Sequence, residues 1–183
     1  MKSQKGFTLF EIITAMSLFV VVILLTNTLY VLGQRSYRTS MNKSELVQNA
    51  RVSLDRLSRE LRQAKTLITD LSTTTAHEIF FQDGHNLDEV TYIRYYLDGT
   101  DMKRSHLAYS FTSDPGVYVY RSAVDAFGNP PDENALEDRI VGEYYSALGF
   151  SGTSTNGLID ISLQLDKNDE EFDIGTKIFL RDW

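Results

Sequence analysis

The stretch GFTLFEIITAMSLFVVVILL, Gly6 to Leu25, opens a long apolar segment with one acidic residue, Glu11. No charged residue follows Glu11 until Arg35, so residues 12–34 are uncharged. At about 1.5 Å per residue, a helix over these residues spans roughly 30 Å, the thickness of the hydrocarbon core of a bilayer. The sequence therefore predicts a transmembrane helix with a carboxylate near its amino-terminal end.

A cleaved secretory signal peptide is the alternative to a membrane anchor. Such a signal needs small residues at a cleavage site directly after the apolar run. Tyr30, Val31 and Leu32 stand there instead, which favours the anchor. Basic residues flank the segment on both sides, so the charge distribution leaves its orientation open.

The residues KGFTLFE, Lys5 to Glu11, resemble the processing motif of type IV prepilins and of the pseudopilins of type II secretion. In that family, a membrane-embedded prepilin peptidase cuts after the glycine on the cytoplasmic side, and the new amino-terminal residue is N-methylated. The resemblance implies a cut between Gly6 and Phe7, methylation of Phe7, and an assembly role for Glu11. Phe10 departs mildly from the family, which often has Leu, Ile or Val before the glutamate.

Glu11 needs a partner if it lies among lipid tails. A carboxylate at the middle of a bilayer costs on the order of 2.5 to 3.5 kcal/mol, and less near the interface. The positive end of the helix offsets only roughly 0.3 to 1 kcal/mol of this. In the family, the glutamate of an incoming subunit is thought to meet the terminal amine of a neighbour, so we expect the partner of Glu11 to be the Phe7 amine of another chain. The alternatives are a carboxylate that is protonated in the membrane, or one that lies at the headgroup level.

Helical periodicity continues beyond the apolar segment. Apolar residues recur at spacings of three and four from Val47 to Leu71, which predicts an amphipathic helix. Charged residues, among them Asp55, Arg59 and Glu60, are expected on its opposite face. A coiled-coil seam is the alternative, but one helix packed on a sheet fits a stripe of this length better. Proline is absent from Phe7 to Ala64, so we expect one nearly continuous helix of roughly 85 Å.

The rest of the chain has the composition of β-strands, with short runs of aromatic and β-branched residues. Asp98 and Gly99 predict a hairpin turn. The segment Ala126–Glu137 is expected to be a surface loop, with a short helix over Ala135–Ile140. Strands are expected at Glu78–Gln82, Val90–Leu97, Ser105–Tyr109, Val117–Arg121, Arg139–Phe150, Leu158–Leu165 and Lys177–Leu180.

The predicted fold class is α+β: a long amino-terminal transmembrane and amphipathic helix packed on antiparallel sheet, the lollipop arrangement of pilins. The expected domain organisation has four parts. They are a cleaved leader (1–6), the transmembrane half of the helix (7–34), its amphipathic soluble half (35–71) and a β-rich body (72–183).

The body also resembles one branch of the family. The segments QNARVSLDRLSRELRQA, LIDISLQL and TKIFLRD are similar to those of J-type minor pseudopilins and PilW-type minor pilins. Major pilins often carry glycine or proline in the membrane half, and residues 7–32 contain neither. The resemblance therefore implies a minor subunit at or near the tip of a type IV pilus or a type II secretion pseudopilus. The alternative is a tip subunit that binds DNA or an exported substrate in an uptake or adhesion machine.

The resemblance also implies a location and a set of partners. The chain would be a single-pass protein of the inner (cytoplasmic) membrane, with its body outside the cytoplasm, and would then enter the pilus or pseudopilus. Its partners would be prepilin peptidase, other pilins or pseudopilins in a heteromeric filament tip, the inner-membrane assembly platform and membrane lipid.

Composition argues against other classes of function. The formal net charge of -7 disfavours nucleic acid as a partner, because phosphate binding needs a local excess of Lys and Arg. Cysteine is absent, and the three histidines lack metal-ligand spacing. Since no catalytic motif is present, we expect neither enzymatic activity nor a cofactor.

The acidic segment DKNDEEFD, Asp166 to Asp173, is a weak candidate for calcium. Asp166, Asn168 and Glu170 alternate as oxygen ligands might. An EF-hand loop would need a glutamate where Lys177 stands, and it would need a glycine after the first ligands. A solvated acidic turn is the favoured interpretation.

Overall fold

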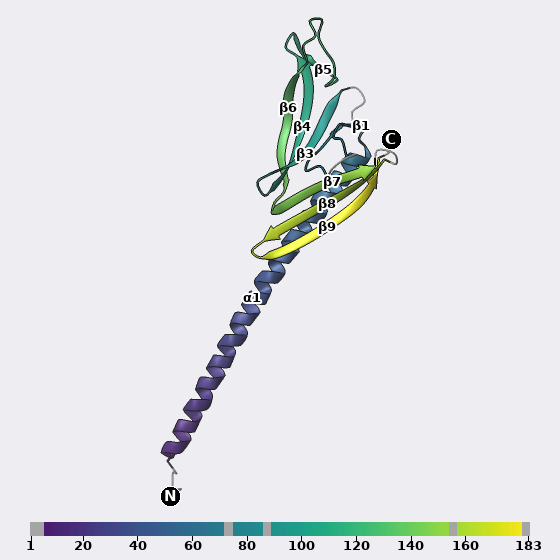
Figure 1. The fold of residues 1–183 in the computed structure, drawn as a ribbon. Coiled ribbons are helices and arrows are strands. Elements are labelled where there is room, and N and C mark those ends of the chain that lie inside the picture. The colour runs from purple at the N-terminus through teal and green to yellow at the C-terminus, as the bar shows by residue number, and fades with distance from the viewer. Residues whose placement is uncertain (1–5, 72–74, 86–88, 154–156, 181–183) are drawn as a thin grey trace. The chain divides into compact units, whose positions relative to one another are not determined.

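The computed structural model describes residues 6–71, 75–85, 89–153 and 157–180. The chain divides into two compact units, Met1–Asn42 and Lys43–Trp183. One helix, α1 (Leu9–Arg62), runs without a break through the end of the first unit and the start of the second (Figure 1). The continuous helix predicted from the absence of proline is therefore confirmed.

In the first unit, the apolar side chains of α1 are exposed along its whole length. Four hydroxyl groups in this part of the helix are satisfied by its own backbone, because each donates to the carbonyl oxygen four residues earlier. These bonds run from Thr14 to Phe10, from Ser17 to Ile13, from Thr26 to Val22 and from Thr28 to Leu24, at 2.8–3.0 Å. A helix of this kind leaves few polar groups for an apolar surrounding to desolvate.

The helix ends earlier than the apolar periodicity suggests. After α1 ends at Arg62, the chain forms strand β1 (Thr66–Leu67), which pairs with β2 (Ile79–Gln82). The Lys65 amide donates to the carbonyl of Gln82 at 3.0 Å, so the backbone here bonds to the sheet instead of to another helical turn. The expectation of a helix up to Leu71 is wrong for this reason.

The described strands of the second unit form two antiparallel sheets (Figure 1). The larger sheet has the order β1-β2-β3-β4-β5, and β6 also pairs with β4. The smaller sheet has the order β7-β8-β9. Their further strands are β3 (Thr91–Asp98), β4 (Asp101–Phe111), β5 (Asp114–Val119), β6 (Asp132–Gly142), β7 (Tyr145–Thr153), β8 (Leu158–Lys167) and β9 (Glu170–Phe179).

Most predicted strands are present, and the differences have local causes. Asp98 pairs with Asp101 around a two-residue turn in which Gly99 has φ 64°, so the predicted hairpin is confirmed. The single strand expected over Arg139–Phe150 is two strands, β6 and β7, and Tyr144 between them has φ 69°. Strand β9 begins at Glu170, well before the expected Lys177.

The short helix expected at Ala135–Ile140 is wrong. These residues belong to β6, which pairs with β4 in a register that places Ala135 opposite Leu107. The expected surface loop is accordingly shorter, because its last residues from Asp132 onward are in the strand. Strand β4 has open hydrogen-bonding groups along this edge, and β6 satisfies them.

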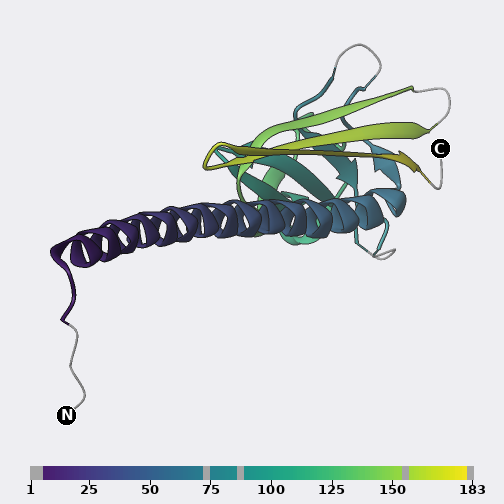
Figure 2. The same ribbon diagram turned by 90° about the horizontal axis from the view of Figure 1, so that it is seen from below.

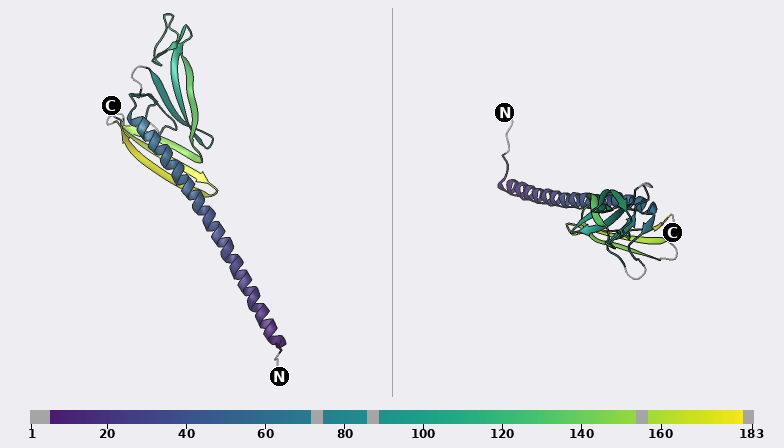
Figure 3. Two further views of the ribbon diagram at one scale, coloured as in Figure 1. Left: turned by 180° about the vertical axis from the view of Figure 1, so that it is seen from behind. Right: turned by 90° about the horizontal axis from the view of Figure 1, so that it is seen from above.

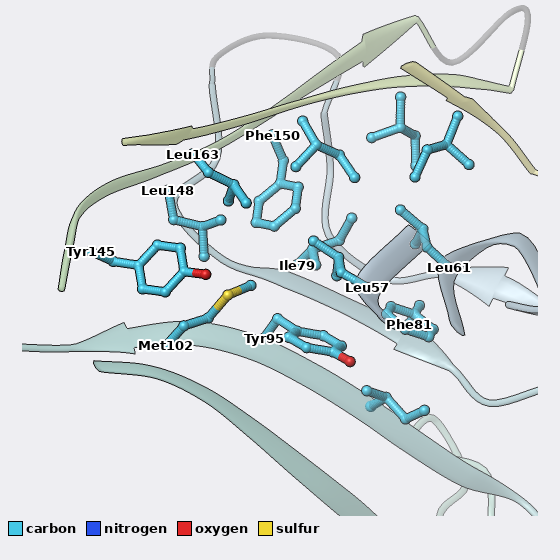
Figure 4. Packing of buried hydrophobic residues seen from close by; sticks show 14 of the residues in the cluster. Leu57, Leu61, Ile79, Phe81, Tyr95, Met102, Tyr145, Leu148, Phe150 and Leu163 are labelled. Atoms are coloured by element: carbon cyan, nitrogen blue, oxygen red, sulfur yellow. The ribbon is translucent and has the colours of Figure 1, made fainter. Parts of the chain in front are cut away.

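The core of the second unit lies between the second half of α1 and the two sheets (Figures 2 and 3). It confirms that one amphipathic helix packs on antiparallel sheet. Figure 4 shows Leu57 and Leu61 of α1 near Phe81 and Tyr95 of the larger sheet, and Leu163 of the smaller sheet beside Phe150 in the same core. Burial of one such side chain contributes about 1.5 to 3 kcal/mol, so this shared core holds the helix and both sheets together.

Candidate processing and assembly site

The residues just before the helix are irregular and exposed. Gly6, Phe7 and Thr8 have no regular secondary structure, and α1 begins at Leu9. The Phe7 side chain is 85% exposed. The Gly6–Phe7 peptide bond therefore lies outside the helix and is exposed.

Thr8 and Glu11 form a capping box at the start of α1. The Thr8 amide donates to Glu11 Oε2 at 2.9 Å, and the Glu11 amide donates to Thr8 Oγ1 at 3.3 Å. The Thr8 hydroxyl also donates to Glu11 Oε2 at 3.0 Å. Each side chain thus satisfies a backbone amide that the first helical turn leaves free.

This partner of Glu11 was missed by the sequence interpretation. The signal was present, because a threonine followed three residues later by a glutamate before an apolar run is the signature of a capping box. The resemblance to prepilins directed attention to a partner in another chain instead. Both bonds from Thr8 reach Oε2, and among the described residues Oε1 has no hydrogen-bond partner.

The helix that follows is long and apolar enough to cross a membrane, judged by length and composition. The most apolar stretch of this helix has no buried residue in the structure. Glu11 lies in the first turn of this helix, near the positive end of its dipole.

A second polar cluster lies inside the body, at the other end of α1. Glu60 was expected on the charged outer face, but its side chain is only 11% exposed and lies against β3 and β4. It accepts hydrogen bonds from Tyr95 Oη at 2.8 Å and from Arg104 Nε at 2.8 Å. Arg56 adds a third bond to Glu60 at 3.2 Å. Arg104 in turn contacts Glu137 of β6 at 3.1 Å.

The surroundings of this cluster stabilise its ionised form. Burial alone would raise the pKa of Glu60, but the hydrogen bonds from Arg104 and Tyr95 outweigh it and hold the pKa below its ordinary value. Burial and the adjacent Glu60 carboxylate raise the pKa of Tyr95. The cluster is a structural ion pair that joins α1 to the larger sheet.

The acidic segment Asp166 to Asp173, the weak candidate for calcium binding, contains the hairpin turn between β8 and β9. Lys167 pairs with Glu170, and the two residues between them, Asn168 and Asp169, have φ 52° and 67°. Positive φ at both positions is typical of the type I′ turns that join hairpin strands. Glu170 forms an ion pair with Lys43 at 3.0 Å. Among the described residues, no three acidic or histidine side chains are grouped as a metal site would require.

Two of the three histidines lie near one carboxylate, and the third lies elsewhere. His77 Nδ1 lies 3.2 Å from the Leu148 carbonyl oxygen. His85 and His106 both lie near Asp83, with ring nitrogens 3.4 and 3.9 Å from its carboxylate oxygens. The sequence spacing did not indicate that Asp83 would stand between two histidines.

Comparison with known proteins addresses only the amino-terminal end. A family model described as the prokaryotic N-terminal methylation motif matches residues 1–26. A search of curated proteins finds no match to the chain. The chain therefore carries the N-methylation motif of type IV prepilin-like proteins, followed by a pilin-like arrangement of one long helix and antiparallel sheets. The motif points to a pilin or pseudopilin that prepilin peptidase processes, which is a structural class and not an enzymatic one.

Proposed function

We propose that the chain is a minor pilin or pseudopilin, placed at or near the tip of a type IV pilus or a type II secretion pseudopilus. In this proposal, prepilin peptidase cuts between Gly6 and Phe7, and the Phe7 amine is then methylated. Glu11 pairs with the Phe7 amine of a neighbouring subunit. The observation that carries the proposal is the methylation motif over residues 1–26, because it covers the start of a helix long enough to span a membrane.

The start of α1 supports the proposed cut. The capping box fixes the first helical residue at Leu9, so the Gly6–Phe7 bond stays outside the helix. Among the described residues, none beyond its chain neighbours has an atom within 4 Å of the position that a Cβ would occupy on Gly6, so the described part of the chain leaves space around this residue. Residues 1–6 are then the leader, of which residues 1–5 lie outside the described part of the chain.

The two oxygens of Glu11 support its proposed role in assembly. Oε2 holds the two bonds from Thr8, and Oε1 has no partner among the described residues. A carboxylate can accept several hydrogen bonds at once. Glu11 can therefore keep its own helix capped while Oε1 accepts the terminal amine of another chain.

We keep the four-part organisation expected from the sequence, with an earlier end of the helix. Residues 7–34 contain the membrane half of α1, which begins at Leu9, and the soluble half ends at Arg62 instead of Leu71. The body follows, and we place it outside the cytoplasm, with a single span in the inner membrane. The inner-membrane assembly platform and the other subunits of the tip are the partners that this topology requires.

The minor role rests on the unbroken helix. From Leu9 to Leu32, α1 contains neither glycine nor proline, so no residue before Gly33, near the end of the membrane half, favours the local unwinding that a bulk subunit can use on assembly. A subunit that begins the filament has no such need, because it is not packed between turns of earlier subunits.

Copy number tests this placement. Filaments sheared from the native host can be purified and their subunits counted by quantitative mass spectrometry with labelled reference peptides. We expect far fewer copies of this chain than of the most abundant subunit. Equal abundance would contradict the minor role, and absence from filaments in which the other minor subunits are detected would contradict incorporation.

A further inference from the structure

Charge is divided between the helix and the sheets of the second unit. Residues 43–65 contain six basic and three acidic residues, whereas residues 66–183 contain eight basic and twenty-one acidic residues. Such a division within one compact unit gives it surfaces of opposite sign.

The basic surface lies on the exposed side of α1. Its centre is formed by Arg51, Arg59 and Arg62, which we name the arginine face. Grooves on either side of the helix share Arg51 and Arg59 in their walls. The nearby acidic residue, Asp55, contacts Arg59 at 4.0 Å, and both side chains are well exposed, so this pair neutralises the face only weakly. Arg51 and Arg62 have no ion pair among the described residues.

The acidic surface lies on the outward side of the smaller sheet. Asp166 of β8 stands directly opposite Glu171 of β9, and Asp173 is the next outward residue along β9. We name these three residues the acidic face. Carboxylates directly opposite each other in an antiparallel pair repel. The two lysines of this hairpin do not relieve the repulsion, because Lys167 pairs with Glu45 and Lys177 pairs with Asp160.

The two faces point in opposite directions. The buried sides of α1 and β8 meet in one core, in which Leu57 and Leu61 of the helix contact the cluster that contains Leu163 and Leu165 of the strand. Figure 3 (left) shows the second half of α1 lying across β7, β8 and β9. The arginine face therefore lies on one side of this core and the acidic face on the other, so they cannot pair within one molecule.

We propose that the arginine face of one copy of this chain binds the acidic face of a second copy. Each contact uses a different surface on each partner, so it is heterologous. The contact brings guanidinium groups to the Asp166–Glu171 pair and removes the like-charge repulsion. It concerns the body alone and does not depend on the pairing of Glu11 or on the position in a filament.

Cysteine cross-linking tests the contact in the full-length chain, which has no cysteine of its own. Two differently tagged copies are co-expressed in membranes, one with Val52→Cys beside the arginine face and the other with Gln164→Cys within the acidic face. Both positions are exposed. A short bismaleimide should join the two tags, whereas neither variant should cross-link to itself, because a heterologous contact does not bring identical positions together.

Charge reversal then tests the cause of the contact. Arg59→Glu with Arg62→Glu should lower the cross-link yield about fivefold or more, and 0.5 M salt should lower it similarly, because exposed ion pairs are screened. Adding Asp166→Arg and Glu171→Arg to the other copy should restore the yield. Asp114→Arg on exposed β5 makes the same charge change as either single substitution of the acidic face, Asp166→Arg or Glu171→Arg, and is the control that should leave the yield unchanged.

Three results would overturn the proposal: a missing cross-link between two well-expressed and folded copies, a yield that charge reversal does not change, or capture only of other filament subunits. Circular dichroism of each variant in detergent establishes that it is folded. The minor-subunit proposal can fail independently, since a chain absent from filaments could still form this cross-link in membranes.

Discussion

At the amino-terminal junction, the two oxygens of one carboxylate are in different situations. Glu11 Oε2 accepts two bonds from Thr8, whereas Oε1 has no partner among the described residues. Oε2 caps the helix through Thr8, and Oε1 remains able to accept a hydrogen bond from a cation. Two substitutions can separate these roles, because glutamine preserves the capping box and alanine at Thr8 preserves the charge.

Glu11→Gln removes the charge and keeps an acceptor for Thr8. We expect normal expression and cleavage but at least about a tenfold loss of incorporation into filaments, because the partner amine would be left without its counter-charge. Immunoblotting of sheared filaments against the membrane fraction measures this ratio. Glu11→Asp is the control that keeps the charge. Unchanged incorporation of the glutamine variant would rule out the pairing.

Thr8→Ala removes the hydroxyl group and keeps the carboxylate. Loss of a helix cap typically costs about 0.5 to 2 kcal/mol, so the first turn of α1 should fray while Glu11 stays charged. We expect faster amide exchange at Leu9 to Glu11 and a smaller loss of incorporation than for Glu11→Gln. Thr8→Ser should behave as the natural chain. Hydrogen exchange with mass spectrometry in detergent provides the measurement, and equal protection in the alanine and serine variants would contradict the cap.

At the scale of elements, the ion pair under the end of α1 links the helix to the larger sheet. Glu60 and Arg104 are both nearly buried and lie 2.8 Å apart. Removal of one member of such a pair costs about 3 to 5 kcal/mol, because the other charge remains buried and unpaired. Glu60→Gln should therefore destabilise the body by about 3 kcal/mol, whereas Asp55→Asn in an exposed pair should cost less than about 0.5 kcal/mol.

The same cluster gives the body a defined response to acid. The folded pKa of Glu60 lies below its ordinary value of 4.5, so its stabilisation is present above that value and is lost as the pH falls below it. The free energy of unfolding should fall in this range for the natural chain and less steeply for Glu60→Gln. Near-UV circular dichroism of the buried tyrosines during urea unfolding, repeated from pH 6 to about pH 3, measures both slopes. Parallel slopes would contradict this role of Glu60.

The close approach between the end of α1 and the segment after β2 requires glycine. A Cβ at Gly84 would lie 2.0 Å from the backbone oxygen of Gln63, which cannot move without disturbing the helix end. Gly84→Ala should lower the stability of the body by about 1 to 3 kcal/mol in thermal unfolding. Gly116→Ala is the control, because its Cβ would meet nothing closer than 4.0 Å. An equal effect of the two would show that backbone entropy, and not the contact, matters.

The sequence predicted the elements better than their ends. Apolar periodicity identified α1, but the same periodicity continued through Ala64 to Leu71, where the chain lies in or beside the sheet and remains apolar because it is still buried. Burial has the same sequence signature whether the backbone bonds to itself or to a neighbouring strand. Glu60 was assigned to the outer face for a related reason, since its partners Tyr95 and Arg104 lie more than thirty residues away.

At the scale of the whole chain, the amino-terminal motif is readable from the sequence, whereas the charged faces of the body are visible only in the structure. The motif at the amino terminus could be recognised from contiguous residues, and the family model matches that same end. The opposed charged faces could not be predicted, because they depend on which sides of α1 and β8 turn toward the shared core. A linear sequence gives the total charge of a body but not the direction in which each charge points.

The amino terminus of the mature protein tests the central claim most directly. Intact and peptide mass spectrometry of the chain, purified from the native membrane, determines its first residue and any methyl group on it. The account predicts a chain that begins at Phe7 with an N-methylated amine. A chain that retains residues 1–6 in a host with active prepilin peptidase would have no amine at Phe7 for Glu11 to pair with, and would contradict it.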